Sequence, residues 1–152
     1  MNVEKLATKR VVTVDGSVTI VDAANEMRNQ HVGVLIVTQE SGASIKAVGV
    51  ITDRDLVVSV IALGLDPKIL TAGDVMSRDL LVASPGDDAS ATIQRMRLAG
   101  VRRVPVVDDL GLLLGLFTLD DYLDHLALGL REVTNLIARE EETEEQSRLA
   151  FH

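Results

Sequence analysis

The stretch that decides the fold is residues 49–55, Gly-Val-Ile-Thr-Asp-Arg-Asp, because a related stretch, Gly-Leu-Phe-Thr-Leu-Asp-Asp, recurs at residues 115–121. Glycine, threonine and aspartate recur in the same order, 66 residues apart. Further outward, an offset of 69 residues places Met27-Arg28 on Met96-Arg97 and Val37 on Val106. The difference in offset falls in the polar stretch 39–47, which we expect to be a loop. The chain therefore reads as an internal repeat, with chance similarity in a Val-rich sequence as the alternative.

Each half of the repeat predicts the order β-α-β-β-α from its apolar periodicity. In the first half we expect strands at 11–14, 32–37 and 48–51, a helix after the cap residue Thr19, and a helix from Asp53 to about Leu63. In the second half we expect strands at 80–83, 101–107 and 112–117, a helix after Asp88, and a helix from Leu119 to about Leu130. Short helices at 3–8 and 71–76 precede the two halves.

Neither half buries enough apolar surface to be stable alone. The predicted fold class is therefore α+β, with two β-α-β-β-α repeats packed as a pseudo-two-fold pair that has a cleft at each end. We expect the first repeat at residues 3–66, the second at 71–130, and a C-terminal helix with an acidic tail at 131–152. That acidic tail is either a solvated helix end or a docking segment for a basic partner.

The composition excludes several classes of protein. Apolar residues make up 47% of the 152 residues, which excludes a disordered chain. The absence of cysteine excludes disulfides, thiolate catalysis and Cys-ligated zinc. A net charge of −8 with only three aromatic residues makes nucleic-acid binding a poor hypothesis. No apolar signal region or membrane-length apolar run is present, so we expect a cytoplasmic protein without membrane insertion.

The two repeated turns are the first candidate site. In each, a strand leads through Thr-x-x-Asp into a helix, at Thr52–Asp55 and at Thr118–Asp121. One interpretation is a capping box that binds nothing. The other is a ligand site, because backbone N–H groups at a helix start suit phosphate and a carboxylate can accept both hydrogens of a ribose diol. The sequence leaves these two interpretations evenly balanced.

Two adjacent arginines, Arg102 and Arg103, interrupt an otherwise apolar strand and are the second candidate site. Successive strand residues point to opposite faces, so we expect one of them to border the interior or a cleft. They are either paired with a carboxylate across the sheet or act as a phosphate clamp. The first repeat has Gly33 and Val34 at these positions, so we expect two unequal clefts. No catalytic constellation is visible, and the adjacent acids Asp120 and Asp121 suggest Mg²⁺ only beside a bound polyphosphate.

These residues closely resemble a tandem pair of CBS domains (cystathionine β-synthase domains), also called a Bateman module, from about Val3 to Leu130. The resemblance implies a regulatory module, not an enzyme, that binds AMP, ADP or ATP, or less commonly S-adenosylmethionine or a dinucleotide. It implies that aspartate holds the ribose, that threonine contacts phosphate or ribose, that basic residues before the proline meet phosphates, and that apolar residues at the strand starts line the adenine pocket. Carried onto this chain, the binding residues are Thr52, Asp53, Asp55, Thr118, Asp120, Asp121, Arg102, Arg103, Pro105, Gly33, Val34, Val12 and Leu81.

The resemblance also implies a homodimer, for which Ala23, Ala24 and the helices 55–63 and 121–130 are available. Because members of this family often regulate a fused protein and this chain has no room for one, we expect action on an effector protein in trans. The alternative hypothesis is a ligand-independent assembly protein that uses the fold as a dimeric scaffold.

Overall fold

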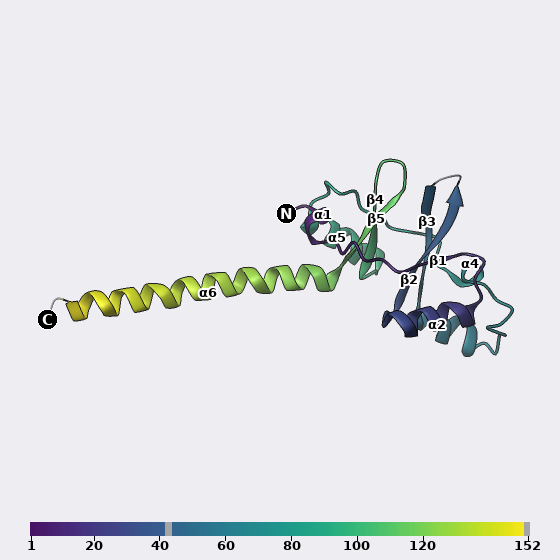
Figure 1. Cartoon of the computed structure of the whole chain (residues 1–152), viewed down its shortest axis with the longest axis horizontal. Helices are drawn as coiled ribbons and strands as arrows, with labels where there is room; N and C mark the ends of the chain where they lie inside the picture. The colour runs from purple at the N-terminus through teal and green to yellow at the C-terminus, as the bar shows by residue number, and fades with distance from the viewer. Residues whose placement is uncertain (42–43, 151–152) are drawn as a thin grey trace. The chain divides into compact units, whose positions relative to one another are not determined.

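The structure is a computed structural model that describes residues 1–41 and 44–150. The chain divides into two compact units, Met1–Thr118 and Leu119–His152. The first unit holds two β-sheets with their helices, and the second is built on one helix (Figure 1). This is the mixed α+β class that the sequence predicts.

In the first repeat, a three-stranded sheet has the order β1-β2-β3 and packs against helices. Its elements are β1 (Thr13–Asp15), α2 (Ile20–Gln30), β2 (Val34–Ser41) and β3 (Ser44–Thr52), followed by α3 (Asp53–Asp55). β1 and β2 are parallel, and β2 and β3 form an antiparallel hairpin. The α2 helix begins where the Thr19 side chain accepts a hydrogen bond from the Asp22 N–H, so the predicted cap is confirmed.

The central strand β2 is buried on both of its faces. Leu35 and Val37 pack with α2 and the helix after Thr52, whereas Val34 and Ile36 pack on the opposite face with Leu116 of the second sheet. This double burial explains the almost continuous apolar run that the sequence shows there. The sheet-to-sheet contact joins the two repeats into one core, which agrees with the expected pairing of the repeats.

The helix expected from Asp53 begins there, but most of its length is a π-helix, η1 (Leu56–Ile61). The Ala62 N–H donates to the Val57 carbonyl, which is a five-residue step. A single apolar face does not reveal this wider winding, because Leu56 and Val60 still point into the core.

The predicted loop at 39–47 is largely wrong. β2 continues to Ser41 and β3 begins at Ser44, so the polar residues form the outer arms of the hairpin, and residues 42–43 lie outside the described part. The backbone groups of an exposed polar stretch still find partners across a hairpin, which residue polarity alone does not show.

The second repeat contains α5 (Ala89–Ala99) and a two-stranded antiparallel sheet of β4 (Arg103–Val107) and β5 (Leu113–Thr118). The strand expected at 80–83 is wrong, because only Ala83 pairs, in a parallel bridge to Val106. The reason is Pro105. In the first repeat the Ile36 N–H donates to the Val12 carbonyl, and the corresponding pair here is Pro105 and Leu81. Because proline has no N–H, this ladder bond cannot form.

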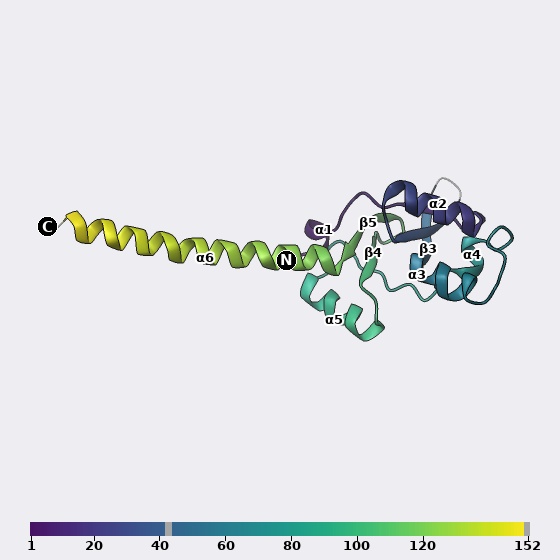
Figure 2. The same cartoon turned by 90° about the horizontal axis from the view of Figure 1, so that it is seen from below.

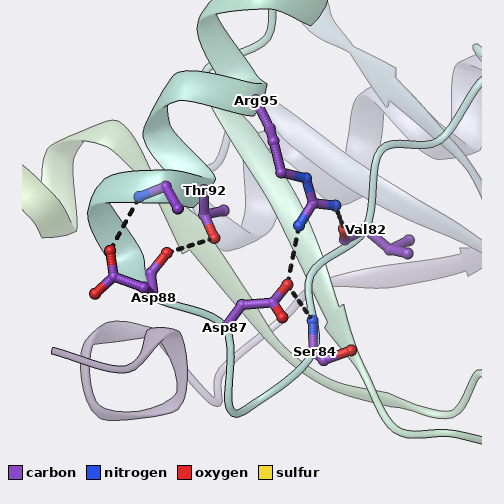
Figure 3. Close-up of polar contacts among 7 residues, drawn as sticks. Val82, Ser84, Asp87, Asp88, Thr92 and Arg95 are labelled. Atoms are coloured by element: carbon purple, nitrogen blue, oxygen red, sulfur yellow. Dashed lines mark hydrogen bonds and ion pairs between the residues drawn. The ribbon is translucent and has the colours of Figure 1, made fainter.

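Arg95 of α5 fastens the segment that has lost this strand (Figure 3). Its guanidinium donates to the Val82 carbonyl and, at 2.9 Å, to the Asp87 carboxylate, which also accepts from the Ser84 N–H at 3.0 Å. The equivalent residue of the first repeat is Glu26, so this anchor belongs to the second repeat alone. Sequence reasoning missed it, because a lone arginine on an exposed helix face carries no signal.

The short helices α1 (Val3–Leu6) and α4 (Ala72–Val75) are exchanged between the repeats. The Ser77 segment pairs with Val50 of the first repeat, and the Thr8 segment pairs with Leu116 of the second. Each of these contacts maps onto the other by the sequence offsets of the repeat. The hydrogen-bond pattern is therefore the pseudo-two-fold arrangement that the sequence predicts.

The helix α6 (Leu119–Ala150) runs unbroken for 32 residues (Figures 1 and 2). The two helical segments expected on either side of Leu130 are therefore one helix, and the acidic run 139–145 lies on it. The expected boundary at Leu130 is not marked by any end of secondary structure.

Candidate ligand-binding turns

The first turn gathers most of its predicted residues at one end of the first sheet. Thr52 ends β3 and lies opposite Val34, the first residue of β2. The Val12 carbonyl accepts from the Ile36 N–H, so Val12 lies at the same end of the sheet. The Asp53 N–H donates to the Gly33 carbonyl at 3.1 Å, which ties the start of the helix to the strand. Residues from four separate stretches of sequence thus meet where α3 begins.

Thr52 and Asp55 form a capping box. The Asp55 Oδ2 accepts from both the Thr52 N–H and the Thr52 hydroxyl at 2.8 Å, and the Thr52 Oγ1 accepts from the Asp55 N–H at 3.2 Å. In the part of the chain that the structure describes, every side-chain hydrogen bond to the Asp55 carboxylate uses Oδ2. The cap is therefore present, and it leaves Oδ1 available to a ligand.

The same Thr-x-x-Asp device occurs at sites that the sequence analysis did not single out. Thr71 and Asp74 form an equal capping box at α4, with both bonds to Asp74 Oδ2 at 2.9 Å. The hydroxyl of Thr19 also donates to Asp22 at the start of α2. The motif alone therefore signals a cap. Position distinguishes the Thr52 turn, because only its place at the end of β3 brings the start of β2 alongside.

The space beside Gly33 belongs to a neighbouring carboxylate. A Cβ added at Gly33 would lie 2.9 Å from Asp53 Oδ2, and the other Asp53 oxygen accepts from the Arg54 N–H. We expected the small residue to leave room near a ligand, whereas the Asp53 side chain already occupies this space. Val34 is buried against Ile36 and Leu116, so it is a core residue of the turn's floor.

In the second repeat, Arg103 opens β4 directly opposite Thr118, the last residue of β5. Arg102 precedes the strand, and both arginine side chains are exposed. The expectation that one of them borders the interior is wrong, because the strand begins only at Arg103. Pro105 is buried and Leu81 is half-buried at the same end of the sheet as Arg103. Asp120 and Asp121 lie in the first turn of α6, in the other unit of the chain.

Hydrogen bonds to helix-start carboxylates also set their acidity. The Thr71 N–H and hydroxyl lower the pKa of Asp74, and the Ala91 N–H lowers the pKa of Asp88, the cap residue of α5. The Ser17 hydroxyl and N–H likewise lower the pKa of Asp15. These shifts belong to caps and turns outside the two candidate sites.

The glycines of the repeated motif serve the fold. A Cβ at Gly115 would lie 2.8 Å from the Thr8 carbonyl oxygen, and a Cβ at Gly49 would overlap the Met76 sulfur and lie 2.9 Å from the Ser77 carbonyl oxygen. Each glycine is the point where the exchanged segment of the other repeat crosses the sheet. A groove of about 410 Å³ also lies between α2 and η1, and its lining is mostly apolar: Ile20, Val21, Ala24, Asn25, Met27, Asp53, Leu56, Val57, Ile61 and Pro67.

This fold, with two symmetric strand-to-helix turns, defines a class of paired regulatory domains, and comparison with known families identifies it. The family described as CBS domain matches residues 3–61 and 72–128, and the chain belongs to that family.

Relatives with this domain occur in distant organisms. The chain is 38% identical over 112 residues to hypoxic response protein 1 of Mycobacterium tuberculosis, covering 71% of this chain and 73% of that protein. It is 32% identical over 123 residues to the Methanopyrus kandleri protein MK0525, of which the match spans only 61%. It is 31% identical to the CBS domain-containing protein YhcV of Bacillus subtilis, covering 79% and 81% of the two chains.

Solved structures confirm the fold. Hypoxic response protein I with two coordinated zinc ions matches with a TM-score of 0.72 at 29% identity, over 82% of this chain and 98% of that one. The CBS domain pair of protein MJ0100, in complex with 5′-methylthioadenosine and S-adenosyl-L-methionine, matches with a TM-score of 0.70 at 26% identity, over 85% and 97% of the chains.

Two other features were searched for in residues 1–41 and 44–150. No group of three or more His, Cys, Asp or Glu side chains there could hold a metal ion. No helix there has both the length and the apolar character needed to cross a membrane.

Proposed function

We propose that this chain is a sensor module that binds an adenosine-containing ligand at its two turns and acts on an effector protein in trans. The observation that carries the proposal is the first turn. There, one carboxylate oxygen of Asp55 completes a cap while the other remains for a ligand, beside the half-buried Val12. The relative MJ0100, whose CBS domain pair is in complex with two adenosine compounds, supports the ligand class.

The two turns differ in charge, so their ligands should differ as well. The first turn carries Asp53 and Asp55 around Arg54, and the second repeat offers the exposed Arg102 and Arg103 opposite Thr118. Guanidinium groups suit phosphate, so we expect AMP, ADP or ATP to prefer the second repeat, with Thr118 and Asp121 as its contacts. Mg²⁺ would enter only with a polyphosphate, near Asp120 and Asp121.

We further propose that the domains divide at residues 3–66, 71–130 and 131–152, and that the module works as a homodimer. The apolar groove between α2 and η1 supports a self-association surface on the helices of the first repeat, because exposed apolar side chains such as Val57 and Ile61 line it.

The test is calorimetric titration of AMP, ATP and S-adenosylmethionine into the wild-type chain and three variants. Asp55→Ala removes the ribose acceptor of the first turn, and Asp121→Ala removes that of the second. Asp74→Ala is the matched control, because it removes the same capping box at α4. Each loss of a charge-assisted hydrogen-bond pair should weaken binding at its own turn by about 10- to 100-fold, while Asp74→Ala leaves both turns intact.

Two results would contradict the proposal. If Asp55→Ala and Asp74→Ala lose structure alike and binding per folded molecule is unchanged, the first turn is only a cap. If none of the three ligands binds the wild-type chain, the ligand-independent assembly protein becomes the better description.

A further inference from the structure

The helix α6 carries an apolar stripe that continues beyond the matched family region. Leucine, valine and isoleucine recur at spacings of four and three residues along one face: Leu119, Leu123, Leu126, Leu130, Val133 and Ile137. Leu119 is half-buried, and the other five are exposed, with Leu130 at 69% and Val133 at 56%. These six residues, here called the seam, occupy successive a and d positions of a heptad repeat. A seam of this kind is the pattern of a helix that pairs with another helix.

We propose that the seam pairs with the seam of a second copy of this chain, with the two α6 helices antiparallel. In that register the residue numbers of each layer sum to a constant, so Leu123 meets Val133 of the second copy and Leu126 meets Leu130. The outer layers join Leu119 to Ile137. All six layers are apolar, and no layer is left with a polar mismatch.

The charges of α6 decide the direction. The helix has nine acidic and three basic side chains, and five of the acids lie in the run 139–145. In a parallel pair, Glu140 and Glu144 would fall on the same a and d face and meet their own copies. The antiparallel register places the two acidic runs about 40 Å apart at 1.5 Å per residue, far beyond the Debye length of about 8 Å.

The positions that flank the seam also permit self-pairing. Between residues 122 and 137 they are Tyr122, Ala127, Gly129, Thr134 and Leu136, none of which is charged. About 12 residues per copy would therefore enter the contact, against roughly 20 to 30 in a standard interface. We expect a dimer of modest stability that dissociates at micromolar concentration and does not require a ligand at the turns.

The absence of cysteine from the chain allows a direct test. Leu123→Cys and Val133→Cys chains are prepared separately, one with a size tag, and mixed under mild oxidation. The antiparallel register gives a disulfide between the two different chains only, because equivalent residues lie about 15 Å apart along the axis. If each variant instead cross-links with itself, the pairing is parallel and the inference is wrong.

Sedimentation velocity of single variants tests which surface holds the dimer. Leu130→Asp should raise the dissociation constant at least about 100-fold, because it buries an unpaired charge in the central layers. Leu128→Asp is the matched control, since Leu128 is an exposed leucine on the opposite side of the helix, and it should leave the dimer intact. Val57→Asp, in the groove of the first repeat, should also leave this dimer intact. A wild-type chain that stays monomeric, or a dimer sensitive to Val57→Asp and not to Leu130→Asp, overturns the inference.

Discussion

His31 is held in a backbone conformation that its own side chain disfavours. It ends α2 in the left-handed region, with φ 56° and ψ 43°, where its N–H caps the helix. The equivalent residue at the end of α5 is Gly100, with φ 68° and ψ 26°. The two repeats therefore make the same turn, but only the second uses the residue that suits it.

We expect His31→Gly to stabilise the chain by about 0.5 kcal/mol, because relief of the left-handed strain exceeds the entropy that glycine adds to the unfolded chain. Gly100→Ala is the reciprocal variant and should destabilise by about 1 kcal/mol, since its added methyl meets open space and only the backbone conformation opposes it. Urea unfolding followed by circular dichroism measures both. A loss of stability in His31→Gly would show that the imidazole itself contributes.

Helix starts in this protein are fixed by carboxylates whose pKa values the fold lowers. Asp74 and Asp88 accept hydrogen bonds from Thr71 and from the Ala91 N–H at the starts of α4 and α5. A carboxylate whose pKa is lower in the folded state stabilises the fold above its unfolded pKa of about 3.9, and this contribution is lost as pH falls through the folded value. Acid should therefore weaken these two helix starts.

The prediction is that an Asp74→Asn, Asp88→Asn double variant loses less stability than the wild type between pH 5 and pH 3. Asparagine still accepts the capping hydrogen bond but does not titrate. Thermal unfolding at a series of pH values compares the two chains. Parallel loss of stability in both would mean that these caps contribute nothing to acid sensitivity.

The two repeats are expected to unfold together, because each holds a segment that precedes the other. Residues 1–8 pack on the second repeat through the Val3 N–H bond to the Asp87 carbonyl and the pairing of Thr8 with Leu116. Removal of residues 1–8 should therefore expose amides of β4 and β5, far from the cut in sequence. Hydrogen exchange read by mass spectrometry tests this. Increased exchange confined to the first repeat would contradict the exchanged arrangement.

Much of the candidate site could be predicted from the sequence, but the role of its residues could not. The Thr-x-x-Asp spacing correctly located the turn at Thr52–Asp55. The same spacing at Thr71–Asp74 is only a cap, and the difference lies in which strand end is nearby. The glycines of the motif looked like part of a ligand loop, whereas Gly49 and Gly115 make room for the segments that carry Ser77 and Thr8.

The sequence by itself determined the repeat, the fold class and the order of elements, because apolar periodicity and capping residues act over a few neighbouring positions. The tertiary structure alone decided the features that depend on partners distant in sequence. Pro105 shortens the first strand of the second repeat only because the Leu81 carbonyl lies across from it. Asp53 fills the space at Gly33 only because the helix start is bonded to that strand. Such effects arise from hydrogen bonds and close contacts between separate segments, which a linear pattern does not encode.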